Sequence, residues 1–209
     1  MNINNYFHIE KQKYYEKTTS EKFLFPDIDK IPQNIKYLWI IDYPTPNDYK
    51  QNSFLSGRAG KTGKKIIESY KIAENFNEDI FIIPKIPLVA ETIQNLSTFK
   101  SKYDKIFEEL QILMIDILVH VYKTFNPEFI WLLETPGSRM KNIMNKYYEE
   151  LELLHKKRFF NKQLKLFNSF ANNNFELDFL RFFYNNYRDS SVINDLNKLG
   201  DLNLIKFFK

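Results

Sequence analysis

The chain has 209 residues, of which 44% are hydrophobic and 17% aromatic, and its formal net charge is +4. This length and hydrophobic content predict a single folded domain with a packed core, and the weak positive charge permits nucleic-acid binding without requiring it. The absence of cysteine excludes disulfides, cysteine zinc sites and iron–sulfur clusters, so we expect no cofactor.

The sequence favours a soluble, cytoplasmic protein. Residues 1–17 are polar and charged and lack the apolar centre of a signal peptide. The longest apolar stretch, residues 112–121, is interrupted by Asp116 and is too short to cross a bilayer. We therefore expect no membrane partner, and the oligomeric state stays open.

Residues 1–34 are predicted to form an N-terminal arm or helical lead-in, punctuated by Pro26 and Pro32. The main domain is predicted over residues 35–209. It begins with an apolar run at residues 36–42, which is typical of a buried strand. The prolines that follow, Pro44 and Pro46, end this strand.

The remaining predicted elements alternate between helix and strand. In chain order they are a helix opened by the glycine-containing segment 56–65, a strand at 79–83, a helix over 90–125, a strand at 128–133, a helix from Ser138 to about residue 158, a strand at 175–184 and a helix over 190–199, with 161–174 left unassigned. This order predicts a three-layer α/β/α fold with a central, mainly parallel four-stranded sheet. In such folds the functional site lies beyond the carboxyl ends of the strands.

Three of the five glycines, Gly57, Gly60 and Gly63, gather at the start of the first predicted helix after the first strand. Glycines at a helix start let backbone N–H groups approach a phosphate, and Arg58, Lys61, Lys64 and Lys65 would add positive charge. The alternative is a tight turn followed by a solvated, basic start of a helix.

The same segment also resembles a nucleotide-binding P-loop. Residues 55–62 nearly follow the spacing G-x-x-x-x-G-K-[ST], but Leu55 stands at the position of the first glycine. A long polar segment also separates this stretch from its strand. Nucleotide binding is therefore a third possibility beside the two functions considered below.

Two acidic residues and one ring flank the exit of the first strand. Asp42 is a candidate for orienting water or stabilising a developing cation, whereas for Asp48 capping of the loop is favoured. Phe54 either stacks on a flat ligand or anchors the loop in the core. Glu134, at the end of the third strand, is a candidate carboxylate or the partner of a basic residue.

The order of these residues resembles the uracil-DNA glycosylase superfamily, particularly its bacterial and archaeal iron–sulfur branch. That family has a strand leading into a G-E-A-P-G-type loop and then a Phe-x-Gly-Arg-Ala-Gly-type turn that opens a helix. Here the strand leads into Asp42-Tyr43-Pro44-Thr45, and residues 54–60 reproduce the turn with one extra residue. The likeness covers roughly residues 36–145.

The resemblance implies a DNA partner and hydrolysis of the N-glycosidic bond of a flipped, damaged or deaminated base. By this likeness Asp42 would be the catalytic carboxylate, and Phe54, Tyr43 and Pro44 would hold the base. The phosphate-facing wall would consist of Gly57, Arg58, Gly60 and Lys61.

Four family features are missing from this chain, namely the cluster cysteines, the asparagine that ends the second strand, the histidine motif after the fourth and the glycines of the G-E-A-P-G-type loop, which are replaced by Ile41 and Thr45. Asn185 and Asn186 are the candidates to replace that histidine as hydrogen-bond donors. The alternative function is therefore a catalytically inactive module of the same fold that binds DNA or a protein.

Overall fold

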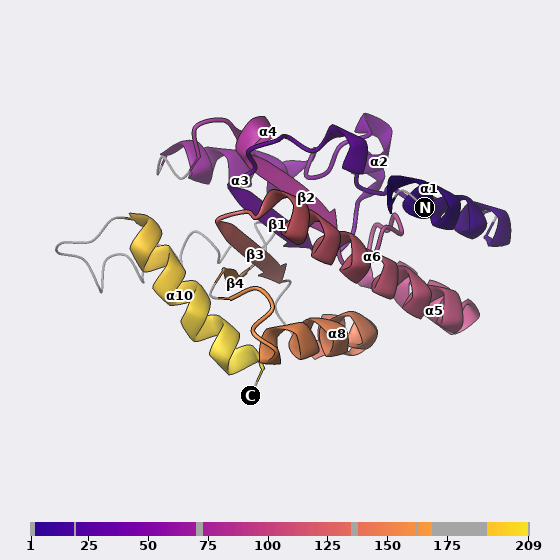
Figure 1. Cartoon of the computed structure of the whole chain (residues 1–209). Coiled ribbons are helices and arrows are strands. Elements are labelled where there is room, and N and C mark those ends of the chain that lie inside the picture. Colours follow the sequence, from indigo (N-terminus) through magenta and orange to yellow (C-terminus); the bar gives the residue numbers. More distant parts are fainter. Residues whose placement is uncertain are drawn as a thin grey trace.

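The computed structural model describes residues 3–18, 20–69, 73–134, 138–161, 163–168 and 192–208. At its centre is a four-stranded sheet in the order β2-β1-β3-β4, in which every neighbouring pair is parallel (Figure 1). The strands are β1 (Tyr37–Ile41), β2 (Ile80–Pro84), β3 (Phe129–Glu134) and β4 (Leu164–Asn168). Helices on both faces complete three α/β/α layers, which confirms the predicted fold class.

Helices connect and cover the strands. They are α1 (Ile3–Lys17), the short 3₁₀ helix η1 (Ile28–Lys30), α2 (Pro46–Gln51), α3 (Arg58–Ser69), α4 (Phe76–Asp79), α5 (Ile93–Lys102), α6 (Asp104–Phe125), α7 (Ser138–Ile143), α8 (Asn145–Lys156) and α10 (Val192–Phe207). None of the helices in the described part of the chain combines the length and apolar character that crossing a membrane requires.

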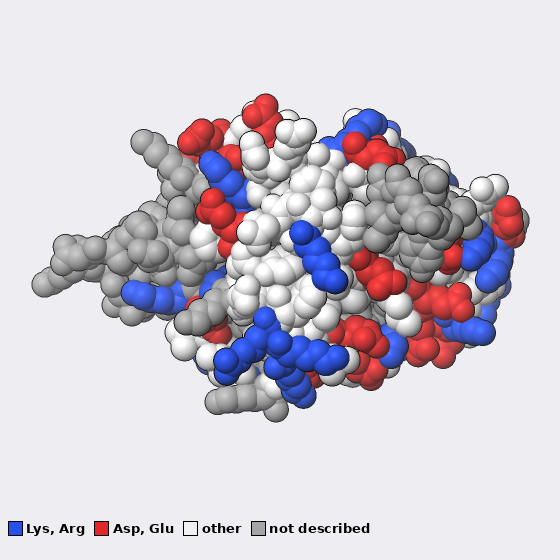
Figure 2. Space-filling view, viewed as in Figure 1, with Lys and Arg blue, Asp and Glu red and all other residues white. Residues whose placement is uncertain are grey.

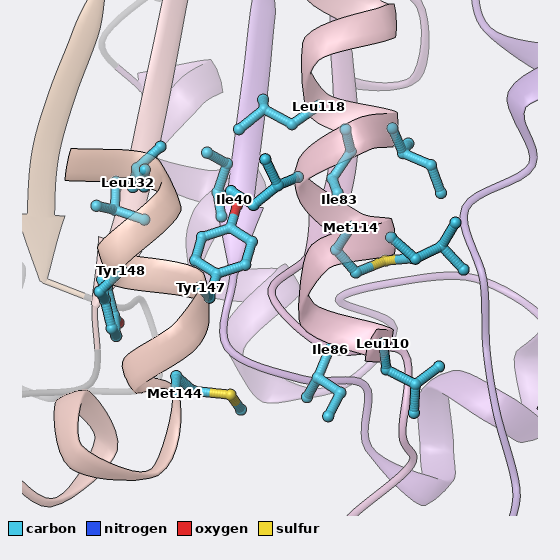
Figure 3. Close-up of a cluster of buried hydrophobic side chains, with 14 of the residues drawn as sticks. Ile40, Ile83, Ile86, Leu110, Met114, Leu118, Leu132, Met144, Tyr147 and Tyr148 are labelled. Atoms are coloured by element: carbon cyan, nitrogen blue, oxygen red, sulfur yellow. The ribbon is translucent and has the colours of Figure 1, made fainter. Parts of the chain in front are cut away.

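The two faces of the sheet bury separate clusters, because successive side chains of a strand point to opposite faces. The first core lies between the sheet and α6 and α8. In Figure 3, Ile40 and Leu132 from the strands face Met114 and Leu118 of α6, and Tyr147 reaches from α8 into the same cluster. All five residues are fully or almost fully buried.

The second core, on the opposite face, combines aliphatic side chains with several aromatic rings. Trp39 and Trp131 occupy paired positions on β1 and β3, and their rings stack with centroids 5.6 Å apart and an interplanar angle of 8°. Phe167 of β4 packs against Trp131, and Phe76 of α4 meets Trp39 edge-on. Ile67 of α3 belongs to the same cluster.

The N-terminal segment packs on the rest of the chain. Phe7 and Tyr14 of α1 are buried in the first core, and Figure 1 shows α1 beside α2 and α6. Phe23 forms an antiparallel bridge with Leu88, just beyond the end of β2. Residues before position 35 therefore share a core with the sheet.

Two predicted helices are each divided in the structure. The helix predicted over residues 90–125 is two helices, α5 and α6, separated at Tyr103, whose φ of −137° and ψ of 49° are not helical. Thr92 caps the start of α5 by accepting from the backbone N–H of Asn95. The helix predicted from Ser138 is likewise two helices, α7 and α8, which meet at Met144.

The fourth strand of the described sheet is β4, which falls in the segment left unassigned by sequence. The strand predicted at residues 175–184 lies outside the described residues. The final helix is confirmed as α10, and it is longer than predicted because it continues to Phe207.

Candidate functional site

A buried ion pair occupies the carboxyl ends of the two strands β1 and β2. The pairing of Ile41 with Pro84 brings the next residues, Asp42 and Lys85, side by side. Lys85 Nζ lies 2.5 Å from Asp42 Oδ1, and the side chains of Lys85 and Asp42 are 0% and 9% exposed. The backbone N–H of Lys85 donates to the carbonyl of Ile41 at 2.8 Å, which extends the β-ladder by one residue.

Further contacts enclose the ammonium group of Lys85. It donates to the carbonyl of Leu133 at 3.3 Å and lies 5.3 Å from the centre of the Tyr148 ring. A charge removed from water is tolerated when a partner and hydrogen bonds compensate it. Asp42 is therefore at the strand end where the sequence predicts it, but its carboxylate is committed to a buried cation.

An open groove of about 790 Å³ lies on the side of the sheet that faces α3 and α4. Its described lining residues are Asn47, Gln51, Ser53, Phe54, Leu55, Ser56, Gly57, Lys61, Lys64, Phe76 and Asn77. We call it the Phe54 groove. The charged residues among them are both lysines, and the others are amides, hydroxyls, apolar side chains and a glycine, so the groove favours an anionic ligand with flat, apolar parts.

The wall of the Phe54 groove depends on Asp48, which is 3% exposed. One carboxylate oxygen accepts from the backbone N–H and the hydroxyl of Thr45, at 2.8 and 2.7 Å. The other accepts from the backbone N–H and the hydroxyl of Ser56, at 2.7 and 2.8 Å. Asp48 thus caps α2 and fastens the loop after it, which is the capping role that the sequence favoured.

Gly60 allows this loop to lie against α3. Leu55 has a positive φ of 52°, and a Cβ at Gly60 would lie 1.4 Å from the carbonyl oxygen of Leu55. Only a residue without a side chain leaves space for that carbonyl. By contrast, a Cβ at Gly57 would meet only the side chain of Asn47, at 3.9 Å.

Two rings contribute the aromatic part of the Phe54 groove. Phe54 and Phe76 are half-buried and pack against the second core. The ammonium group of Lys64 lies 5.0 Å from the centre of the Phe76 ring, a cation–π contact. Lys61, one turn earlier on α3, is exposed.

The structure brings some of the predicted site residues together. Phe54, Gly57 and Lys61 line one groove. Gly60 is buried in the first turn of α3, against Leu55. Arg58 is the first residue of α3, and its side chain lies outside the described part of the structure.

The other predicted site residues lie elsewhere. Asp42, Tyr43 and Pro44 are not among the described residues that line the Phe54 groove. Tyr43 packs against the first core, on the opposite face of the sheet, where burial and then the charge of Asp42 raise the pKa of its hydroxyl. The carbonyl of Pro44 accepts from the N–H of Ala90 at 3.0 Å.

Several candidates fall outside the described residues. They are Asn185, Asn186 and the side chain of Glu134. In the described part of the chain, no cluster of three or more histidine, aspartate or glutamate side chains could hold a metal ion.

The P-loop alternative is disfavoured by the local structure. The stretch is already helical from Arg58, and the N–H of Lys61 donates to the carbonyl of Gly57 at 3.2 Å within this first turn. A P-loop needs an extended loop over the same residues so that successive N–H groups surround a phosphate.

Other basic residues lie far from this groove along the chain. Figure 2 shows lysine and arginine side chains gathered on one face near the place where α8 ends in Figure 1. Lys156, Lys157 and Arg158 are exposed at this helix end, and Lys156 pairs with Glu152 at 2.5 Å. Cations at the end of a helix offset its dipole. His155, beside them, stacks on Phe208 with centroids 5.3 Å apart.

Two residues of these arrangements were missed by sequence reasoning. Lys85 carried a signal, since a lone lysine between Pro84 and Pro87 follows a strand that was expected to lie near the first. Phe76 carried none, because its contact with Lys64 joins α3 to the start of α4, 12 positions later in the chain. In comparisons with known proteins, no protein-family model and no curated protein sequence matches this chain.

Proposed function

We propose that this chain is a DNA-binding module of the uracil-DNA-glycosylase-like type, which holds DNA in the Phe54 groove. The observation that carries the proposal is the composition of this groove. Phe54, the bend at Gly57 and the exposed cation Lys61 share one wall, and the described lining residues include no carboxylate.

The chemistry of the groove suits a nucleic acid. Lys61 and Lys64 can neutralise phosphates, a contribution that weakens as salt increases. The start of α3 adds the partial positive charge of a helix N-terminus. A half-buried phenylalanine can stack on a base of any sequence, and such a contact contributes about 1–3 kcal/mol.

The buried ion pair favours binding over catalysis. A carboxylate that activates water or stabilises a sugar cation must reach the substrate. Asp42 is paired with Lys85 and only 9% of its side chain is exposed. Removing that pairing in the course of a reaction would leave Lys85 as an uncompensated buried charge.

Fluorescence anisotropy with labelled DNA tests the proposal. We expect the double variant Lys61→Glu/Lys64→Glu to weaken binding, and the slope of log affinity against log salt to fall by about 1.4–1.8, or 0.7–0.9 for each phosphate contact. The matched control is Lys105→Glu/Lys123→Glu, which makes the same charge change at exposed positions of α6. If both double variants weaken DNA binding equally, the effect is one of general charge, and the proposal that DNA binds in the Phe54 groove is refuted.

Base excision is the second candidate function. It is favoured by the position of Asp42 directly after β1, where the resemblance places the catalytic carboxylate. We would test release of uracil, hypoxanthine and xanthine from oligonucleotides by the wild type and by Asp42→Asn. No release by the wild type, or release that is unchanged in a folded Asp42→Asn variant, would defeat this candidate.

A further inference from the structure

The Phe54 groove continues into a second depression along the edge strand β2. This depression, which we call the β2 hollow, has a volume of about 460 Å³. Its described lining residues are Lys11, Leu24, Phe25, Asp27, Lys30, Asn52, Ser53, Phe54, Phe76, Asn77, Ile80, Phe81 and Ile82. Ser53, Phe54, Phe76 and Asn77 line both depressions, so the two rings stand on a shared boundary.

Lysines line both depressions of the combined surface. Lys61 and Lys64 line the groove, and Lys11 and Lys30 line the hollow. The hollow also holds Asp27, whose carboxylate lies 2.9 Å from Lys30 Nζ, so the net positive charge of the hollow comes from Lys11. An occupant that follows both depressions would meet lysines in each of them and aromatic rings at their shared boundary.

We infer that the occupant is single-stranded DNA, with a base stacked on Phe54 and its backbone running from the groove into the hollow. This inference rests on the proposed function. Unpaired bases expose ring faces that can stack on aromatic side chains, while phosphates on either side meet lysines.

A duplex matches this surface less well. Its base faces are covered by their neighbours, and only base edges are offered in its grooves, where they are read by protruding helices or strands. Phe54 and Phe76 are half-buried and line depressions. A duplex would therefore contact the lysines without using the rings.

The test compares three probes of equal length by fluorescence anisotropy, namely single-stranded oligothymidylate, its duplex with oligoadenylate, and a single strand with abasic sites. We expect the base-bearing single strand to bind about 5- to 150-fold more tightly than the other two, as one stacked base alone would give. An oligoribothymidylate of the same length, which differs from the DNA strand only in the 2′-hydroxyl, shows whether the sugar matters.

The variant Phe54→Leu isolates the stacking contribution. We expect it to weaken binding of the base-bearing single strand by about 5- to 150-fold, the equivalent of one lost stack, and to leave duplex binding unchanged. Phe125→Leu, at a half-buried ring at the end of α6, is the control. Lys30→Glu provides a second test, since it should weaken binding of long strands that reach the hollow but not of short ones.

The outcomes distinguish DNA binding as such from a preference for single-stranded DNA. If no probe binds, the proposed function itself fails. If single strand, duplex and abasic strand bind equally and the Lys61→Glu/Lys64→Glu variant weakens all three, DNA binding stands and the single-strand inference is overturned. Equal effects of Phe54→Leu and Phe125→Leu would also overturn it.

Discussion

The Asp42–Lys85 pair shows how one residue interaction shapes both stability and function. Lys85 is fully buried, and its ammonium group reaches Asp42 and the carbonyl of Leu133. The pair joins the ends of β1 and β2 to β3. Because the carboxylate of Asp42 is held in this pair, it does not line the Phe54 groove.

We predict that Lys85→Met lowers the free energy of unfolding by about 3–5 kcal/mol, because it leaves the buried carboxylate of Asp42 without its cation. Urea denaturation measures this change. The double variant Asp42→Leu/Lys85→Met should recover most of the loss, since an apolar pair needs no compensation. If the single variant is as stable as the wild type, water reaches the carboxylate and the pair is not structural.

Gly60 and Gly57 are expected to differ sharply in their tolerance of alanine. Alanine stabilises a helix interior by about 1 kcal/mol relative to glycine, but at Gly60 its Cβ would overlap the carbonyl of Leu55. We predict that Gly60→Ala is destabilising by about 1–3 kcal/mol and that Gly57→Ala changes stability by less than about 0.5 kcal/mol. Thermal and urea denaturation of both variants provide the comparison, and equal behaviour would contradict the close packing of this loop.

At the scale of elements, the strands were the most predictable part. The runs at 36–42, 79–83 and 128–133 are apolar between their ends because both faces of β1, β2 and β3 are largely buried. β4 escaped prediction because Lys165 interrupts its pattern. Lys165 is buried and reaches Asp201 of α10 at 2.6 Å, a partner 36 residues away that no local pattern reveals.

The candidate site was predictable only in part, because some of its contacts join segments that are distant in the chain. Phe54, Gly57 and Lys61 lie close together in the chain, so their shared groove follows from a short loop and the start of one helix. The pairing of Asp42 with Lys85 and the approach of Phe76 depend on how distant segments pack. The break at Tyr103 was also hidden, since neither glycine nor proline marks it.

The α2–α3 connection is predicted to depend on Asp48. In Asp48→Ala, the N–H groups of Thr45 and Ser56 lose their acceptor, so both amides should exchange with solvent faster than in the wild type. We expect a loss of about 1–3 kcal/mol in stability and weaker DNA binding through a distorted Phe54 groove. Asp104→Ala, at an exposed position at the start of α6, is the control, and unchanged exchange at Ser56 would argue against this role.

At the scale of the whole molecule, buried phenols should limit stability in alkali. Burial, and then the charges of Glu128 and Asp79, raise the pKa of Tyr37 from 10.0 to about 12. The folded chain therefore keeps a proton that the unfolded chain releases. Stability is fully present below pH 10 and is lost as the pH rises from about 10 to about 12.

Denaturation in urea at a series of alkaline pH values tests this dependence. Tyr37→Phe should reduce the slope of stability against pH in that range. A part of the slope should remain, because burial also raises the pKa values of Tyr43 and Tyr122. An identical slope in the variant would mean that Tyr37 ionises as freely in the folded as in the unfolded chain.

The stacked indoles give this chain a built-in optical reporter. Trp39 and Trp131 are its two tryptophans, and both are buried in the middle of the sheet. Ultraviolet emission of the folded protein should therefore come from a dry environment, at short wavelength, with the two chromophores electronically coupled. Because Phe76 touches Trp39 edge-on and also lines the Phe54 groove, an occupant of the groove should change this emission without any added label.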